Sequence, residues 1–265
     1  TRSVGRAYNL NEQFTVEVDY GGAPPVPAGF NWDLWLGPRE FRPYHPAYAP
    51  YVWRDWWAFG TGSLGNLAVH NLDGAVWALN LVHPTSVEAV TTGGVDSESS
   101  GFGGMYTFRF GARGDLPPVK MTWYDGGLRP PFPEEVDSDD LRQRLGDGGD
   151  GMLLVGEKGY ITTASNCRAP RLLPLDLHKS YKRPDPTIPR VKGHHADWLS
   201  ACKGGTPASA NFEYGARLTE LILLGNVALR TGKRIQWDPV AMRATNAPEA
   251  DAFIREECRK GWEIV

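Results

Sequence analysis

The sequence is poor in cysteine, in net charge and in long apolar runs. Its 265 residues include three widely separated cysteines, Cys167, Cys202 and Cys258, so neither a disulfide framework nor a zinc site is expected. The formal net charge is -3 and Lys and Arg form no run, which argues against nucleic acid and anionic membranes as partners. No apolar stretch approaches the roughly 20 residues that cross a bilayer. We therefore expect a soluble protein, either cytoplasmic or exported with its signal removed.

Sequence motifs for nucleotide binding and hydrolysis are missing as well. The chain has no G-x-G-x-x-G after a strand, no P-loop, no G-x-S-x-G elbow and no H-E-x-x-H pair. It therefore carries no Rossmann domain and no nucleotide cradle of its own.

What is present is a mixture of helical and strand-like patterns. Apolar residues at three-and-four spacing predict helices at 64–79 and 213–229. A further helix is predicted at 194–203, which ends at the C-cap signal Gly204-Gly205. Short runs between Gly-rich or Pro-rich turns predict strands at 14–20, 87–91, 105–110, 119–124, 152–155 and 160–163. Residues 133–150 are acidic and Gly-rich, as in a surface excursion. The pattern favours an α+β fold with an open-faced, mainly antiparallel sheet and helices on one side.

Residues 23–59 form a loop dense in Pro, Trp and Tyr. Proline blocks regular structure while the aromatic rings favour burial, so this loop should be irregular and ordered. The rings either stack on sugar faces or complete the core, and both interpretations stay open. The candidate substrate-binding residues here are Trp32, Trp35, Tyr48, Trp53, Arg54 and Trp57.

The helix after Gly60 carries the strongest candidate for chemistry. Asn66, His70 and Asp73 follow one another at spacings of four and three residues, so they project from one side of a helix. An imidazole exchanges a proton near neutrality and can take the hydroxyl proton when an alcohol is oxidised. The alternative is that His70 only satisfies polar groups of the core.

A second histidine pair, His194 and His195, begins the helix predicted at 194–203. Adjacent histidines point in different directions on a helix, so at most one should face a given pocket. The pair is either structural or substrate-binding. Metal binding is the weaker interpretation because no third ligand has a suitable spacing.

Several longer motifs carry a family resemblance. They are Trp32-Asp33-Leu34-Trp35-Leu36-Gly37-Pro38, Tyr44-His45-Pro46-Ala47-Tyr48, the stretch from Trp53 to Gly65, Gly148-Gly149-x-Gly151-Met152-Leu153, Asn211-Phe212-Glu213-Tyr214 and Leu223 to Arg230. Together they resemble the carboxy-terminal domain of bacterial Gfo/Idh/MocA oxidoreductases. The resemblance implies one substrate-binding and oligomerisation domain over residues 1–265, with NAD or NADP held mainly by a separate Rossmann domain that this chain lacks.

The resemblance further implies a sugar or polyol substrate and a homo-oligomer formed through the open sheet face. The family's helix carries the motif Asp-x-x-x-His. Here His70 matches the His of the motif, and Asn66 occupies the position of its Asp. An amide takes no proton, so Asn66 departs from ordinary dehydrogenase chemistry. Three hypotheses follow: the substrate domain of a sugar dehydrogenase inactive as a fragment, an NAD-recycling enzyme that cleaves glycosides through a keto-sugar, and a non-catalytic carbohydrate-binding or assembly module.

Overall fold

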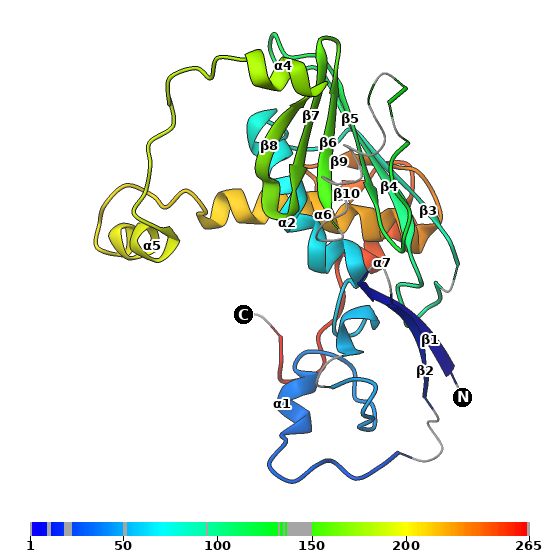
Figure 1. Ribbon diagram of the computed structural model, residues 1–265. Helices are drawn as coiled ribbons and strands as arrows, with labels where there is room; N and C mark the ends of the chain where they lie inside the picture. Colours follow the sequence, from blue (N-terminus) through cyan, green and yellow to red (C-terminus); the bar gives the residue numbers. More distant parts are fainter. Residues whose placement is uncertain are drawn as a thin grey trace. The chain divides into compact units, whose positions relative to one another are not determined.

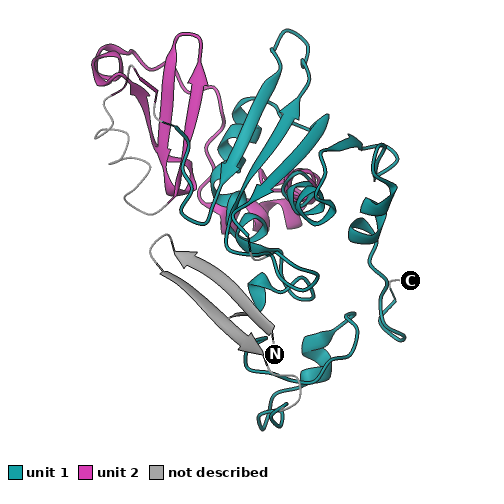
Figure 2. Cartoon of the chain, turned by 90° about the vertical axis from the view of Figure 1, so that its right-hand side faces the viewer, with its two compact units in different colours: residues 1–131, 221–265 teal, residues 132–220 magenta. Residues whose placement is uncertain are grey.

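The computed structural model describes residues 2–9, 12–18, 23–49, 52–93, 95–131, 133–134, 136 and 150–263. They form two compact units, unit 1 from residues 1–131 and 221–265 and unit 2 from residues 132–220 (Figure 2). Asp19, Tyr20, Tyr51, the Gly148-Gly149 motif and most of the predicted excursion at 133–150 lie outside the described residues. The assignment of residues 1–265 to one functional domain stays a prediction.

Unit 1 is built on a five-stranded antiparallel sheet in the order β10-β9-β3-β4-β5 (Figure 1). Its strands are β3 (Ser86–Thr91), β4 (Gly104–Phe110), β5 (Val119–Tyr124), β9 (Ile235–Asp238) and β10 (Arg243–Ala244). A separate antiparallel pair comprises β1 (Arg2–Asn9) and β2 (Glu12–Val18). The helical elements are α1 (Trp32–Leu36), η2 (Val52–Asp55), α2 (Gly62–Ala78), η4 (Pro248–Ala250) and α7 (Asp251–Ile254), together with the second half of α6 (Phe212–Thr231).

The two faces of this sheet differ in polarity. Along β4, Tyr106, Phe108 and Phe110 are buried on one face, whereas the other face carries half-buried Met105, buried Thr107 and exposed Arg109. One face is therefore more completely covered than the other. The covered face packs on α2 and α6, because Gly225 of α6 approaches both Leu64 of α2 and Phe108. The predicted fold, an open-faced and mainly antiparallel sheet with helices on one side, is confirmed.

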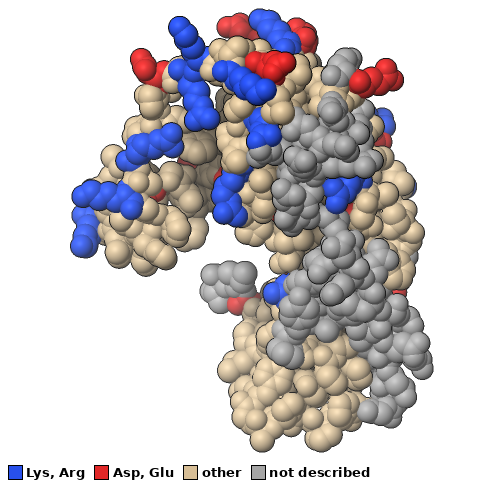
Figure 3. Space-filling view, in the orientation of Figure 1, with Lys and Arg blue, Asp and Glu red and all other residues tan. Residues whose placement is uncertain are grey.

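Unit 2 contains a smaller antiparallel sheet in the order β6-β7-β8. Its elements are β6 (Gly151–Gly156), β7 (Gly159–Ala164), η3 (Ser165–Cys167), β8 (Arg168–Leu173), α4 (Leu175–Ser180), α5 (His194–Cys202) and the first half of α6. Leu173 is fully buried among Leu153, Tyr160 and Leu175. Within α4, Asp176 and Lys179 form an ion pair. Acidic and basic side chains are intermixed at the top of the view in Figure 3.

Helix α6 approaches both α2 and the sheet of unit 1 closely at Gly225. A Cβ atom at this position would lie 2.5 Å from Leu64 Cδ2, 3.2 Å from Phe108 Cζ and 3.3 Å from Tyr106 Cδ1. All three neighbours are at most 4% exposed, so none can move into solvent. The absence of a side chain at Gly225 therefore sets the distance between α6, α2 and the sheet.

Replacing Gly225 with Ala should lower the free energy of unfolding by up to about 2 kcal/mol, because overpacking costs about 1–3 kcal/mol and the gain in helix propensity offsets roughly 1 kcal/mol of that cost. Gly215→Ala is the matched control, since nothing lies within 4 Å of a Cβ at that position of α6. It should stabilise the protein instead. Urea unfolding of both variants checks this, and a Gly225→Ala variant as stable as the wild type would contradict the packing argument.

Candidate functional site

The turn that leads into α2 has no room for side chains at two positions. A Cβ at Gly60 would lie 2.2 Å from the carbonyl oxygen of Arg54, and one at Gly62 would lie 2.7 Å from Ser100 Cβ. Gly62 also has a φ of +66°, which glycine adopts without steric cost. The Gly-x-Gly sequence therefore fixes the start of α2 against η2 and Ser100.

A buried carboxylate holds the first turn of α2 to the sheet. Asp125 is 6% exposed and accepts hydrogen bonds from the Gly104 N–H at 2.6 Å and the Trp123 Nε1–H at 2.9 Å. The hydroxyl of Ser63, in the first turn of α2, also bonds to it. Burial raises the pKa of Asp125, and the hydrogen bonds from Trp123, Gly104 and Ser63 oppose that shift. The position of α2 is thus tied to both β4 and β5.

With its start fixed, α2 presents two different sides. Its buried side comprises Gly62, Leu64, Ala68, Asn71, Leu72, Ala75 and Val76. On the opposite side His70 is exposed, while Asn66 and Asp73 are half-buried. The same side carries two large exposed apolar residues, Val69 at 39% and Trp77 at 57%. The structure therefore brings Asn66, His70 and Asp73 together on one accessible helix face, which we call the α2 face.

Much of the aromatic segment lies inside the protein. Trp32, Leu36, Ala47, Tyr48 and Trp56 form a buried cluster. Trp32 Nε1 donates to the Arg42 carbonyl at 2.8 Å and Trp56 Nε1 to the Ala47 carbonyl at 2.9 Å. Trp32 and Tyr48, which are 7% and 0% exposed, therefore complete the core, as one of the two interpretations of this segment predicted.

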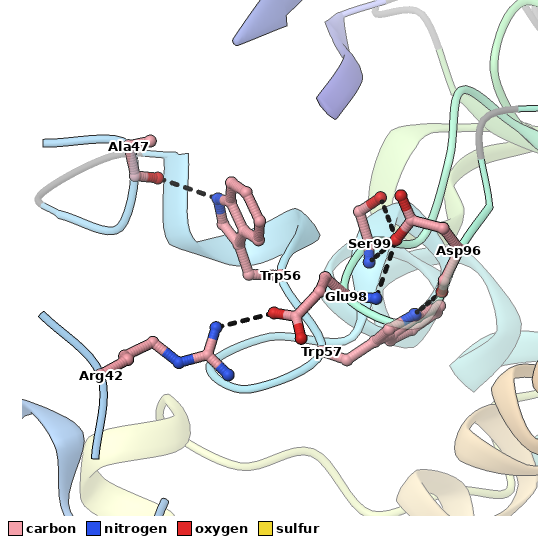
Figure 4. A network of polar contacts seen from close by, with 7 residues as sticks. All are labelled: Arg42, Ala47, Trp56, Trp57, Asp96, Glu98 and Ser99. Carbon is pink, nitrogen blue, oxygen red and sulfur yellow. Dashed lines mark hydrogen bonds and ion pairs between the residues drawn. The ribbon is translucent and has the colours of Figure 1, made fainter. Parts of the chain in front are cut away.

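Polar contacts join this segment to the loop before β4. Arg42 pairs with Glu98 at 2.8 Å, and Trp57 Nε1 donates to the Asp96 carbonyl at 3.1 Å (Figure 4). The Asp96 carboxylate in turn accepts from the backbone N–H groups of Glu98 and Ser99. These bonds explain how a segment without regular structure is held in place.

Three of the predicted substrate-binding residues remain partly accessible. Trp35, Trp53 and Arg54 are half-buried, and the Arg54 guanidinium lies 4.7 Å from the centre of the Trp53 ring. The Trp35 Nε1–H is buried and has no acceptor within the described part of the chain. Because η2 packs against α2, Trp53 and Arg54 lie on an element next to the α2 helix.

His194 and His195 lie in unit 2, at the exposed start of α5. Their ring centres are 4.6 Å apart. Asp197, one turn into the helix, accepts from the Ser209 N–H at 2.8 Å and the Ser209 hydroxyl at 2.7 Å, and these bonds lower the pKa of Asp197. Asp197 therefore has a local structural role, and substrate binding by the two histidines stays a prediction.

Unit 1 also contains a cavity of about 330 Å³ that was not predicted from the sequence. Its lining includes Arg39, Asn226, Arg230 and Glu256. Asn226 could have been identified, since it is a polar residue within the apolar stripe predicted for 213–229. Arg39 and Glu256 meet across more than 200 positions of sequence, and no local pattern predicts such a contact.

The described residues also limit which kinds of site are present. Among them, no group of three or more His, Cys, Asp or Glu side chains is arranged to hold a metal ion. No helix in the described ranges is long and apolar enough to cross a membrane.

Comparison with known proteins finds a family similarity for part of the chain. Residues 8–101 match the family described as "Oxidoreductase family, C-terminal alpha/beta domain", a range that includes the aromatic segment and all of α2. A comparison with curated proteins gives no match. The motifs quoted beyond residue 101 lie outside the matched range. The match over residues 8–101 and the open-faced antiparallel sheet both support a Gfo/Idh/MocA C-terminal domain in this chain.

Proposed function

We propose that this chain is the substrate-binding part of an oxidoreductase that acts on a hydroxyl group of a sugar or polyol, with NAD or NADP as the cofactor. The observation that carries the proposal is the α2 face, where a histidine, an amide and a carboxylate lie together on an accessible helix surface. The family is one of oxidoreductases. The substrate class and the cofactor are part of the proposal.

The Gly-rich turn before α2 does not fit a dinucleotide cradle. Such cradles place a Gly-rich turn between a strand and a helix, whereas the Gly-x-Gly turn before α2 follows a 3-10 helix and a turn. In the proposal, a separate dinucleotide-binding domain therefore holds the cofactor. The residues of this chain hold the substrate and move its proton.

On the α2 face we assign separate roles to the three polar residues. A ring nitrogen of His70 accepts the proton of the reacting hydroxyl. Asp73, three residues further on, accepts hydrogen bonds from substrate hydroxyls. Asn66 orients the substrate through its amide, which both donates and accepts hydrogen bonds. Trp53 and Arg54 of the neighbouring η2 would contact the sugar ring and its hydroxyl groups.

Replacing His70 with Gln should lower kcat by about 10²–10⁴-fold, the usual contribution of a positioned general base. The assay follows reduced-nicotinamide absorbance of the full-length protein with NAD or NADP across a panel of sugars and polyols. His178→Gln is the control, because His178 lies in unit 2 and accepts a backbone hydrogen bond from Leu172. Equal activities of the two variants would remove His70 from the mechanism.

Asn66 favours a second candidate function. Asn66 departs from the Asp of the family's dehydrogenase motif. In this second function the complete enzyme oxidises its substrate transiently and uses the keto-sugar to cleave a glycosidic bond, with the bound cofactor recycled. In that case product analysis should show cleaved glycoside without net reduction of NAD, and Asn66→Asp should leave net reduction absent. Net reduction by the wild type would instead support the dehydrogenase, and Asn66→Asp should then increase it. If sugars bind but neither reduced NAD nor cleaved glycoside forms, the result would support a non-catalytic carbohydrate-binding module.

The open face of the five-stranded sheet is our candidate for self-association. Val90 pairs with Met105 and Met105 with Tyr124 across β3, β4 and β5, so three large side chains form one row on this face. Val90 is 60% exposed. We propose that a second copy of the chain covers the row, since the outer face of an antiparallel sheet is either solvated or buried against a partner.

Val90→Glu should shift the protein from oligomer to monomer in sedimentation experiments, because each copy would bury an unpaired carboxylate. Val240→Glu is the control for adding a charge, since Val240 is 95% exposed in the turn between β9 and β10. A wild type that sediments as a monomer at micromolar concentration would refute this proposal.

A further inference from the structure

The cavity in unit 1 is separate from the α2 face. It lies between residues 38–39 and 57–61, the second half of α6, and residues 253–258. Its volume of about 330 Å³ falls in the range of small-molecule sites. Neither Asn66 nor His70 is among its lining residues, so a ligand here would leave the α2 face accessible.

A buried amide in the cavity wall has one unsatisfied hydrogen-bonding atom. Asn226 is 6% exposed, and its Nδ2 donates to the carbonyl oxygen of Thr61 at 2.8 Å. This bond fixes the orientation of the amide and leaves Oδ1 without a donor among the described residues. A buried acceptor without a donor is costly. A hydroxyl group of a ligand in the cavity would satisfy it.

Two guanidinium groups share one carboxylate at the cavity. Glu256 contacts Arg39 through Oε2 and Arg230 through Oε1, the latter at 3.1 Å. Burial lowers the pKa of Arg230, and the neighbouring Arg39 lowers it further. Glu256 alone is thus shared by two guanidinium groups. The carboxylate of Glu257 also belongs to the lining, but this residue is exposed and its charge is screened by solvent.

The walls also hold Arg230 in a fixed place. Its guanidinium carbon lies 4.2 Å from the centre of the Phe253 ring and 5.2 Å from that of Trp57. Gly60 and Thr61, at the start of the 17-residue helix α2, are part of the same lining. Thr61 makes no side-chain cap bond to the first turn, and the N-terminus of a helix favours negative charge.

We propose that this cavity binds a small polyhydroxylated monocarboxylate such as an aldonate. The carboxylate of the ligand lies against Arg39, Arg230 and the start of α2. A hydroxyl group donates to Asn226 Oδ1, and the carbon chain packs on Trp57 and Phe253. The site is independent of the proposed reaction at the α2 face, because Asn66, His70 and Asp73 do not line the cavity.

Titration calorimetry with three six-carbon probes tests this ligand class. D-gluconate carries both the carboxylate and the hydroxyl groups, sorbitol lacks the carboxylate, and hexanoate lacks the hydroxyl groups. We expect gluconate to bind at least about tenfold more tightly than either, because each control loses hydrogen bonds that the site provides. Equal affinity for sorbitol would overturn the role of charge. Equal affinity for hexanoate would overturn the role of Asn226, and no saturable binding of gluconate would overturn the site.

Three variants then locate the binding. Arg39→Gln should weaken gluconate about tenfold and leave sorbitol unchanged, while Glu256 keeps its pair with Arg230. Arg39 has a side chain 38% exposed, so the variant should fold. Arg234→Gln, which removes an equivalent charge at Glu88 on the sheet, and His70→Gln should both leave gluconate affinity unchanged. A loss of gluconate affinity with His70→Gln would place gluconate at the α2 face. A loss with Arg234→Gln equal to that with Arg39→Gln would show that only the net charge of the protein matters. Either result overturns the proposal.

Discussion

The close approach of α6 to α2 at Gly225 is the contact on which the rest of unit 1 depends. The missing side chain lets Leu64, Phe108 and Tyr106 meet the backbone of α6. The next residue, Asn226, then reaches the Thr61 carbonyl at the start of α2. These two neighbours in sequence set both the spacing and the register of the two helices. The rotation of α2 follows, and with it the outward position of Asn66, His70 and Asp73.

The aromatic segment serves this arrangement mainly as structural support. Its indole N–H groups donate to backbone carbonyls that an irregular chain would otherwise leave unpaired. The Arg42–Glu98 pair adds a charged contact to the same region. The number of aromatic residues therefore reflects the needs of a core without regular structure. Of the predicted substrate-binding residues in this segment, Trp35, Trp53 and Arg54 remain partly accessible.

Local periodicity predicted most of the fold correctly. The three predicted helices correspond to α2, α5 and α6, and strands β3 to β7 lie close to their predicted positions. Strand β8 was missed because Pro170 interrupts its pattern, which is tolerated at the edge position that β8 occupies beside β7. Strand β9 was missed because it has only four residues.

The candidate sites differ in how far the sequence could predict them. Spacing alone placed Asn66, His70 and Asp73 on one side of a helix, and the exposure of His70 agrees with this. The cluster of Arg39, Arg230 and Glu256 depends on the C-terminal residues folding back on the aromatic segment. That contact is set by tertiary packing, so periodicity carries no information about it.

Helix α2 has almost no surface that is free to vary. One side of α2 packs against the sheet and α6, and the opposite side is the α2 face with Asn66, His70 and Asp73. Gly60 and Thr61, at the start of the helix, line the cavity. Attempts to alter the specificity of this protein by random substitution in α2 would therefore mostly produce unstable or inactive chains. Changes of specificity should arise more readily in η2 and the C-terminal residues, whose side chains reach these regions without being part of the core.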